Sequence, residues 1–212
     1  MTGPTVAVLD YGSGNLRSAE RALARAGGDV TVTSDLDLAA QADGLVVPGV
    51  GAYAACMAGV VELGAGPMIA ARVAEGRPVL GICVGMQIMF SHGEEHGVVT
   101  KGLGLLPGGV TRLDAERVPL MGWNTVAPPV GSWLFAGIGP ATQFYFVHSY
   151  AARPGELLDA TGACVTTSVH GGEFVAAVET GHLAATQFHP EKSGDAGSAV
   201  LRNWIRTLRT SG

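Results

Sequence analysis

A cysteine flanked by glycines stands where an apolar run gives way to a helical pattern. Cys83 is the middle residue of 81–85, which read GICVG, directly after the apolar stretch 78–82. In a strand-to-helix turn of this type the nucleophile is lifted clear of the sheet, and the glycines avoid Cβ clashes with neighbouring backbone. The N–H groups that open the following helix would favour the thiolate, the nucleophilic form. A buried cysteine acting as a small apolar residue is the alternative, but the pattern favours a nucleophile.

A thiol nucleophile needs a base and a third group that orients the base. Residues 187–191, with the sequence QFHPE, offer both. In an extended segment residues i and i+2 point the same way, so His189 and Glu191 can share a face, and Pro190 favours that extended form. A carboxylate there would hold the imidazole and stabilise its protonated state. Taken alone the segment could simply lead into the last helix; taken with Cys83 it indicates a Cys-His-Glu triad.

Two backbone N–H groups are candidates for an oxyanion hole. Val50 lies between Gly49 and Gly51 at the end of an apolar strand, so its N–H can turn toward a ligand. The N–H of Val84, directly after the nucleophile, would be the second donor. An ordinary strand-to-helix turn would also explain the Gly49–Gly51 pattern.

Two further motifs carry less chemistry than their composition suggests. Residues 10–15 (DYGSGN) resemble a phosphate cradle, but Arg17 stands where the third glycine of G-x-G-x-x-G is needed, and the chain has no Walker A sequence. His92 and His96 have the i, i+4 spacing of zinc ligands. However, Gly93 weakens a helix there and no third ligand is evident, so we expect a solvated loop. We therefore expect no cofactor and no metal.

The elements that must position these residues follow from the apolar patterns. The first half alternates β-branched strands at 6–9, 30–33, 44–47 and 78–82 with helical patterns at 15–26, 54–63, 68–75 and 86–90. The second half is strand-like at 110–113, 143–150, 163–169, 174–179 and 183–188, and ends in a helix capped by Ser193. The pattern predicts an α/β fold, one domain over residues 1–212, with an open, mixed, mostly parallel sheet and helices on both faces.

Composition excludes several classes of protein. Hydrophobic residues make up 47% of the 212 residues and charged residues 15%, which is typical of a compact globule. A net charge of −5 with scattered Lys and Arg gives no footprint for nucleic acid. We see no signal peptide and no apolar run near the roughly 18 residues of a membrane span. Three widely separated cysteines argue against a disulfide framework, so we expect a cytoplasmic protein.

With these residues in place, the chain resembles the triad-type, class I glutamine amidotransferases over essentially its whole length. Residues 81–87 (GICVGMQ) and 189–193 (HPEKS) match the two signatures of that family. Residues 10–15, 48–51 (PGVG), 121–124 (MGWN) and 146–150 (FVHSY) are similar to one branch, the glutaminase subunits that serve a cyclase of histidine biosynthesis. The resemblance implies a flavodoxin-like core.

The resemblance also implies roles that the pattern leaves open. Glutamine would be held by Gln87 and by the backbone around Gly49, Gly51, His148, Ser149 and Tyr150. A (β/α)₈ cyclase partner would be faced, in a heterodimer, by Asn15, Trp123, Asn124 and Lys192.

In the implied reaction, the Cys83 thiolate attacks the side-chain carbonyl of glutamine and His189 manages the protons. Ammonia would pass to the cyclase, and the complex would act as a lyase that makes imidazole glycerol phosphate and an aminoimidazole carboxamide ribonucleotide. Three alternatives stay open: a glutaminase subunit of another amidotransferase, a stand-alone cysteine hydrolase of γ-glutamyl compounds, and a catalytically inactive regulatory module. The complete triad set argues against the last.

Overall fold

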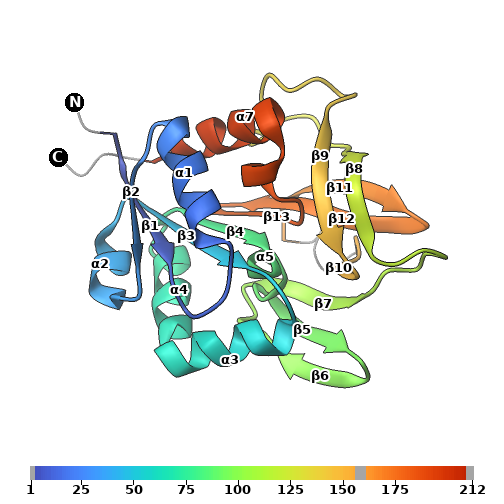
Figure 1. The fold of residues 1–212 in the computed structure, drawn as a ribbon, viewed down its shortest axis with the longest axis horizontal. Coiled ribbons are helices and arrows are strands. Elements are labelled where there is room, and N and C mark those ends of the chain that lie inside the picture. The colour runs from blue at the N-terminus through green and yellow to red at the C-terminus, as the bar shows by residue number, and fades with distance from the viewer. Residues whose placement is uncertain (1–2, 156–160, 209–212) are drawn as a thin grey trace.

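The computed structural model describes residues 3–155 and 161–208, and its centre is a seven-stranded sheet (Figure 1). The strand order is β11-β12-β13-β4-β3-β1-β2. Five neighbouring strands pair in parallel: β2 (Asp29–Thr33), β1 (Thr5–Leu9), β3 (Gly44–Gly49), β4 (Val79–Cys83) and β13 (Leu183–Thr186). At one edge, β12 (Gly172–Thr180) and β11 (Cys164–His170) continue the sheet in antiparallel fashion. The predicted mixed, mostly parallel sheet is confirmed.

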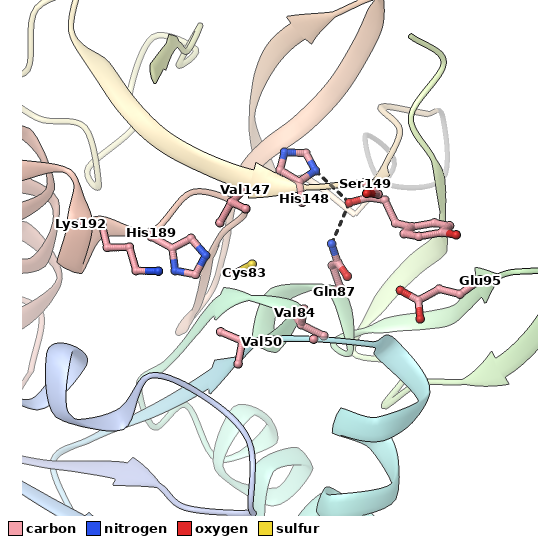
Figure 2. Close-up of a pocket in the computed structure, with 12 residues that line it drawn as sticks. Val50, Cys83, Val84, Gln87, Glu95, Val147, His148, Ser149, His189 and Lys192 are labelled. Atoms are coloured by element: carbon pink, nitrogen blue, oxygen red, sulfur yellow. Dashed lines mark hydrogen bonds between the residues drawn. The ribbon is translucent and has the colours of Figure 1, made fainter. Parts of the chain in front are cut away.

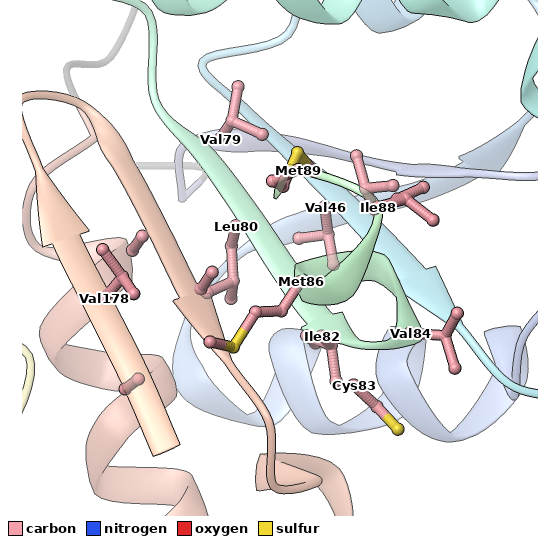
Figure 3. Close-up of a cluster of buried hydrophobic side chains, with 14 of the residues drawn as sticks. Val46, Val79, Leu80, Ile82, Cys83, Val84, Met86, Ile88, Met89 and Val178 are labelled. Atoms are coloured by element: carbon pink, nitrogen blue, oxygen red, sulfur yellow. The ribbon is translucent and has the colours of Figure 1, made fainter. Parts of the chain in front are cut away.

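Helices cover both faces of this sheet. The helices α1 (Leu16–Ala26) and α7 (Gly194–Ile205) pack together on one side, and α2 (Leu36–Gln41), α3 (Tyr53–Leu63) and α4 (Ala65–Ala74) lie on the other (Figure 1). Every residue of β3 and β4 is buried, as expected for central parallel strands covered on both sides. The short helix α5 (Val84–Gln87) packs its Met86 into the hydrophobic core beside these strands. The Cys83 sulfur points away from that core (Figure 3).

Two smaller sheets complete the fold, and here several sequence predictions are wrong. One has the order β10-β7-β5-β6: Tyr150–Ala152, Leu106–Arg112, Phe90–Glu95 and Val98–Lys101; the other pairs β8 (Leu120–Thr125) with β9 (Gln143–His148). The strands predicted at 110–113 and 143–150 therefore lie outside the main sheet. The helix predicted at 86–90 gives way to β5, because the chain after α5 pairs with β7.

Three local predictions also need correction. The helix α2 was missed, although Asp35 accepts hydrogen bonds from the N–H groups of Asp37 and Leu38 as an N-cap. Strand β3 continues through Pro48 to Gly49 instead of ending at residue 47. Ser193 precedes α7, but its hydroxyl donates to the His189 carbonyl at 2.7 Å instead of capping the helix.

Within residues 3–155 and 161–208, no single helix is long and apolar enough to cross a membrane. Only α3 and α4 taken together reach that length, and they are bent by 89° relative to each other.

Candidate active site

Cys83 occupies a strained turn between β4 and α5. Its backbone has φ 56° and ψ −116°, a conformation that non-glycine residues rarely adopt. The flanking glycines make the turn sterically feasible: a Cβ on Gly85 would lie 1.9 Å from the Val47 carbonyl oxygen, and one on Gly81 would lie 2.9 Å from the Gly85 oxygen. The sequence analysis predicted that these glycines avoid Cβ clashes with neighbouring backbone. That prediction is confirmed, since any side chain at Gly81 or Gly85 would strike the backbone.

The end of β3 presses against the same turn. A Cβ on Gly49 would lie 2.4 Å from the Gly85 nitrogen, so the two backbones touch directly. Beyond this contact the chain bends at Gly51, which has a φ of 86°. The Val50 segment is thereby placed at the rim of the site, next to Cys83.

The strand order brings His189 to the nucleophile. Strand β13 lies beside β4 with Thr186 opposite Ile82, so the residues that follow β13 pass the end of β4 where Cys83 stands. The His189 Nδ1 lies 2.8 Å from Glu191 Oε1, and the two side chains are 2% and 3% exposed. His189 and Cys83 line the same cavity, and Cys83 is among the groups that raise the pKa of His189. Because Nδ1 is engaged by the Glu191 carboxylate, Nε2 is the ring nitrogen left to serve Cys83, and the structure brings Cys83, His189 and Glu191 together.

The surroundings of His189 favour its protonated form. Burial alone would lower its pKa, but the hydrogen bonds and charges of Cys83 and Glu191 outweigh burial and raise the pKa to about 9. Among the described residues the second carboxylate oxygen, Glu191 Oε2, is buried without a hydrogen-bond partner, which leaves the charge directed at the imidazole. An imidazolium beside a thiol is the arrangement that activates a cysteine nucleophile.

A cavity of about 280 Å³ opens over Cys83 (Figure 2). It is lined by Val50, Gly51, Cys83, Val84, Gln87, Glu95, Val147, His148, Ser149, Tyr150, His189 and Lys192. The residues assigned to glutamine binding by resemblance thus line one pocket, except Gly49, which lies behind Val50 against Gly85. Lys192, assigned to a partner interface, also lines it.

Glu95 is a pocket residue that the sequence analysis missed. Its Oε2 accepts a hydrogen bond from the Tyr53 N–H at 2.9 Å, and it is the only carboxylate among the lining residues. It belongs to β5, in the segment that was predicted to be a solvated loop around His92 and His96. That prediction is wrong, because β5 pairs with both β6 and β7. A signal was present in the adjacent glutamates 94 and 95, but nothing in their spacing pointed to Cys83.

The two peptide groups that flank Val50 are held by side chains that do not line the pocket. The Val50 N–H donates to Ser13 Oγ at 3.4 Å, and the Val50 carbonyl accepts from Ser13 Oγ at 3.0 Å and from Cys56 Sγ at 3.4 Å. Just upstream, the buried Tyr11 hydroxyl donates to the Pro48 carbonyl. The Val50 N–H, one of the two donors predicted for the oxyanion hole, is therefore bonded to Ser13 in this structure. Within residues 10–15, which resemble a phosphate cradle in sequence, Tyr11 and Ser13 hold the 48–50 segment in place.

The residues assigned to a partner surface differ in how far they are exposed. Asn15 and Lys192 are exposed, and Trp123 is 53% exposed with its ring against Tyr145. Asn124 is half-buried, and its amide donates to the Val169 carbonyl at 3.0 Å. Around Trp123 the sheet β8–β9 and the neighbouring β11 also expose the apolar side chains of Met121 and Val169.

Across the part of the chain that the structure describes, no group of three or more His, Cys, Asp and Glu side chains could hold a metal ion. His92 lies in β5 opposite Lys101, and the ring of His96 packs edge-on against Tyr150.

This fold and this pocket define a class of protein. Residues 7–208 match the family model described as glutamine amidotransferase class-I, and the chain belongs to that family. It is 62% identical over 208 residues to the imidazole glycerol phosphate synthase subunit HisH of Mycolicibacterium paratuberculosis, covering 98% of this chain and 100% of that protein. It is 60% identical over 211 residues to the same subunit of Nocardia farcinica, covering 98% and 100%.

Solved structures agree on the fold. A putative GMP synthase subunit of Thermoplasma acidophilum superposes with a TM-score of 0.71 at 22% identity, over 97% of this chain and 94% of that one. PurLQS from Thermotoga maritima superposes with a TM-score of 0.72 at 20% identity, over 98% and 100%.

Proposed function

We propose that this chain hydrolyses glutamine to glutamate and ammonia, and that it passes the ammonia to a cyclase partner in histidine biosynthesis. The observation that carries the proposal is the grouping of Cys83, His189 and Glu191: His189 lines the pocket beside Cys83, and its Nδ1 lies 2.8 Å from Glu191 Oε1. Membership of the class I amidotransferase family and the names of the relatives, which are subunits of imidazole glycerol phosphate synthase, support the same reaction.

In the first half-reaction, the Cys83 thiolate attacks the side-chain carbonyl carbon of glutamine. A carbon–sulfur bond forms, the carbonyl electrons move onto oxygen, and backbone N–H groups at Val84 and a reoriented Val50 stabilise that oxyanion. His189 then donates its proton to the amide nitrogen, the carbon–nitrogen bond breaks, and ammonia leaves. In the second half-reaction, neutral His189 takes a proton from water, which attacks the thioester, and glutamate is released with Cys83 restored. Glu191 keeps the ring aligned throughout.

Recognition of glutamine follows from the polarity of the pocket. Both N–H bonds of the Gln87 amide are used within the protein, by the Tyr150 carbonyl at 2.8 Å and by Gln187 Oε1 at 3.0 Å. Only Gln87 Oε1 remains to accept from a ligand, and the Glu95 carboxylate lies on the same wall. These two acceptors suit the α-ammonium group of glutamine, while backbone groups around Gly51, Ser149 and Tyr150 suit the rest of the amino acid.

The proposed partner would dock through exposed side chains on the β8–β9 sheet and near the triad. Met121, Trp123 and Val169 expose apolar side chains on β8 and β11. Exposed Asn15 lines a small cavity with His189 and Glu191, and exposed Lys192 lines the pocket over Cys83. A (β/α)₈ cyclase seated there, as a cytoplasmic heterodimer, would receive ammonia before water protonates it and would use it to make imidazole glycerol phosphate and an aminoimidazole carboxamide ribonucleotide.

The test is glutamate release from the purified chain, measured alone and with a purified cyclase and its ribonucleotide acceptor. Strong stimulation by the pair supports the proposal. Full activity of the lone chain would favour a stand-alone hydrolase of γ-glutamyl compounds, and stimulation only by a different synthase would favour another amidotransferase.

A further inference from the structure

The amide of Gln187 lies beside the proposed nucleophile. Gln187 directly follows β13, is fully buried, and has its Nε2 3.8 Å from Cys83 Sγ. Its own backbone N–H donates to the Ala176 carbonyl of β12 at 2.8 Å, so the main sheet fixes where the side chain begins. A buried amide in this position either directs an N–H at the sulfur, which favours the thiolate, or directs its oxygen there, which disfavours it. The direction of the amide therefore decides its effect on Cys83.

A carbonyl in the pocket wall sets that direction. The Tyr150 oxygen can only accept hydrogen bonds, so Gln87 must turn its Nε2 toward it, at 2.8 Å, and His148 must turn a protonated Nδ1 toward it, at 2.9 Å (Figure 2). The second N–H of Gln87 donates to Gln187 Oε1 at 3.0 Å. With its oxygen committed to Gln87, the Gln187 amide presents its NH₂ group to Cys83.

We propose that Gln187 is a further catalytic residue, which stabilises the Cys83 thiolate with a hydrogen bond, and that Gln87 is the positioning residue that orients the Gln187 amide. The inference rests on the proposed nucleophilic role of Cys83. It gives Gln87 a second task, distinct from contact with the substrate. The chain Tyr150–Gln87–Gln187–Cys83 links the wall of the glutamine pocket to the reacting sulfur.

The size of the effect follows from the geometry. A hydrogen-bond donor to a negatively charged acceptor lowers the pH at which that group loses its proton by roughly one to two units. The 3.8 Å contact between Gln187 and Cys83 belongs at the lower end of that range. Loss of the donor should therefore raise the pH at which Cys83 becomes reactive by about one unit. The other titratable groups near Cys83 are His189, Tyr11 and Cys56, with Lys192 and Glu95 in the same pocket, and substitutions at Gln187 leave all of them in place.

The experiment measures the rate at which iodoacetamide alkylates Cys83 in the full chain between pH 5 and pH 10, followed by mass spectrometry of the peptide that contains Cys83. Gln187→Met keeps the length of the side chain and removes the donor, and its rate profile should shift upward by about one pH unit. Gln143→Met, an exposed glutamine at the start of β9, is the matched control and should leave the profile unchanged.

A second variant distinguishes loss of the hydrogen-bond chain Tyr150–Gln87–Gln187–Cys83 from a packing defect. Gln87→Met leaves Gln187 in place but removes what orients it, so we expect an upward shift of smaller size. In the Gln187→Met background, Gln87→Met should cause no further shift of the alkylation profile, because the hydrogen-bond chain to Cys83 is already broken. A folded Gln187→Met variant with the wild-type profile would overturn the proposal; if that variant does not fold, an unshifted Gln87→Met profile would overturn it. Fully additive shifts would overturn the role given to Gln87.

The assay does not use glutamine, so its outcome is separate from that of the proposed function. Should Cys83→Ala retain glutamine-dependent synthesis, the nucleophile assignment fails, whatever the alkylation profiles show.

Discussion

The hydroxyl of Ser13 offers a direct test of whether residues 49–51, called the oxyanion loop below, control hydrolysis. Ser13→Ala removes the two hydrogen bonds that join this side chain to the peptide groups on either side of Val50, one to the Val50 carbonyl at 3.0 Å and one from the Val50 N–H at 3.4 Å. Each is worth about 0.5–1.5 kcal/mol net, and the longer one belongs at the low end, so the bound orientation loses roughly 1–2 kcal/mol relative to a rotated one. That corresponds to a rise of about 5- to 30-fold in the rotated population.

Rotation matters because it frees the Val50 N–H. A second oxyanion donor is worth on the order of 10²–10³ in rate, so a small rotated fraction controls hydrolysis by the isolated chain. We expect Ser13→Ala to raise basal glutamate release by roughly tenfold, while the rate of the complex with its acceptor changes little because rotation is already complete there. Glutamate release by the lone chain and by the complex is the assay.

Two companion variants sharpen this test. Ser198→Ala removes a hydroxyl that donates to the Gly194 carbonyl on α7, at 2.9 Å, and should leave both rates unchanged. Val50→Pro removes the N–H altogether, so it should bind glutamine yet respond poorly to the acceptor. An unchanged or lower basal rate in Ser13→Ala, in a folded protein, would refute the reasoning, as would undiminished stimulation of Val50→Pro.

The remaining predictions concern the triad and the pocket wall. Cys83→Ala should abolish glutamine-dependent synthesis by the complex while added ammonium salts still support it; loss of both activities would make Cys83 structural. Cys164→Ala is the matched control and should keep full turnover, since this half-buried thiol lies on β11, outside the pocket. Glu191→Gln should lower turnover by at least about tenfold, toward the roughly 10⁴-fold loss known for serine triads, with an unchanged melting temperature; near-normal turnover would contradict its role. Burial lowers the pKa of His148 to about 4, so the folded state resists a proton that the unfolded chain accepts near pH 6.5. Stability is therefore lost as pH falls below that value, and from pH 7 to pH 5 urea unfolding should show wild type losing about 2 kcal/mol more than His148→Asn.

Cys56 has a different standing in these tests. The triad assigned from the sequence does not include Cys56, so by that criterion alone Cys56→Ala would leave turnover nearly unchanged. The structure places its sulfur 3.4 Å from the Val50 carbonyl and 3.2 Å from Ser13 Oγ. We now expect a modest rise in the basal rate of the lone chain, which makes Cys164 the better control.

The parts of this molecule that local sequence could predict are those with local causes. The buried strands β1, β3 and β4 are short apolar runs, and the elbow at Cys83 depends on glycines within two residues of it. His189 and Glu191 lie two residues apart, so their shared face also follows from a short extended segment.

The parts that could not be predicted depend on contacts between distant residues. Strand β5 has no period of two in its burial, because it pairs with β7 through a register shift, and Glu95 was missed with it. Ser13 reaches Val50 across 37 residues, and Gln87 reaches Gln187 across 100. In both cases the function of a polar side chain depends on which atom of its partner can donate, and that is a property of the folded arrangement.

The contact between Gly49 and Gly85 determines where the oxyanion loop can bend. Upstream of Val50, the chain is fixed by the touching backbones of these glycines and by the bond from Tyr11 to Pro48. Rotation can therefore begin only beyond Gly49, in the two peptides that flank Val50. A rotation of these peptides would turn the Val50 N–H without moving Cys83, so under the proposed control the nucleophile keeps its place beside His189 whichever way the loop points.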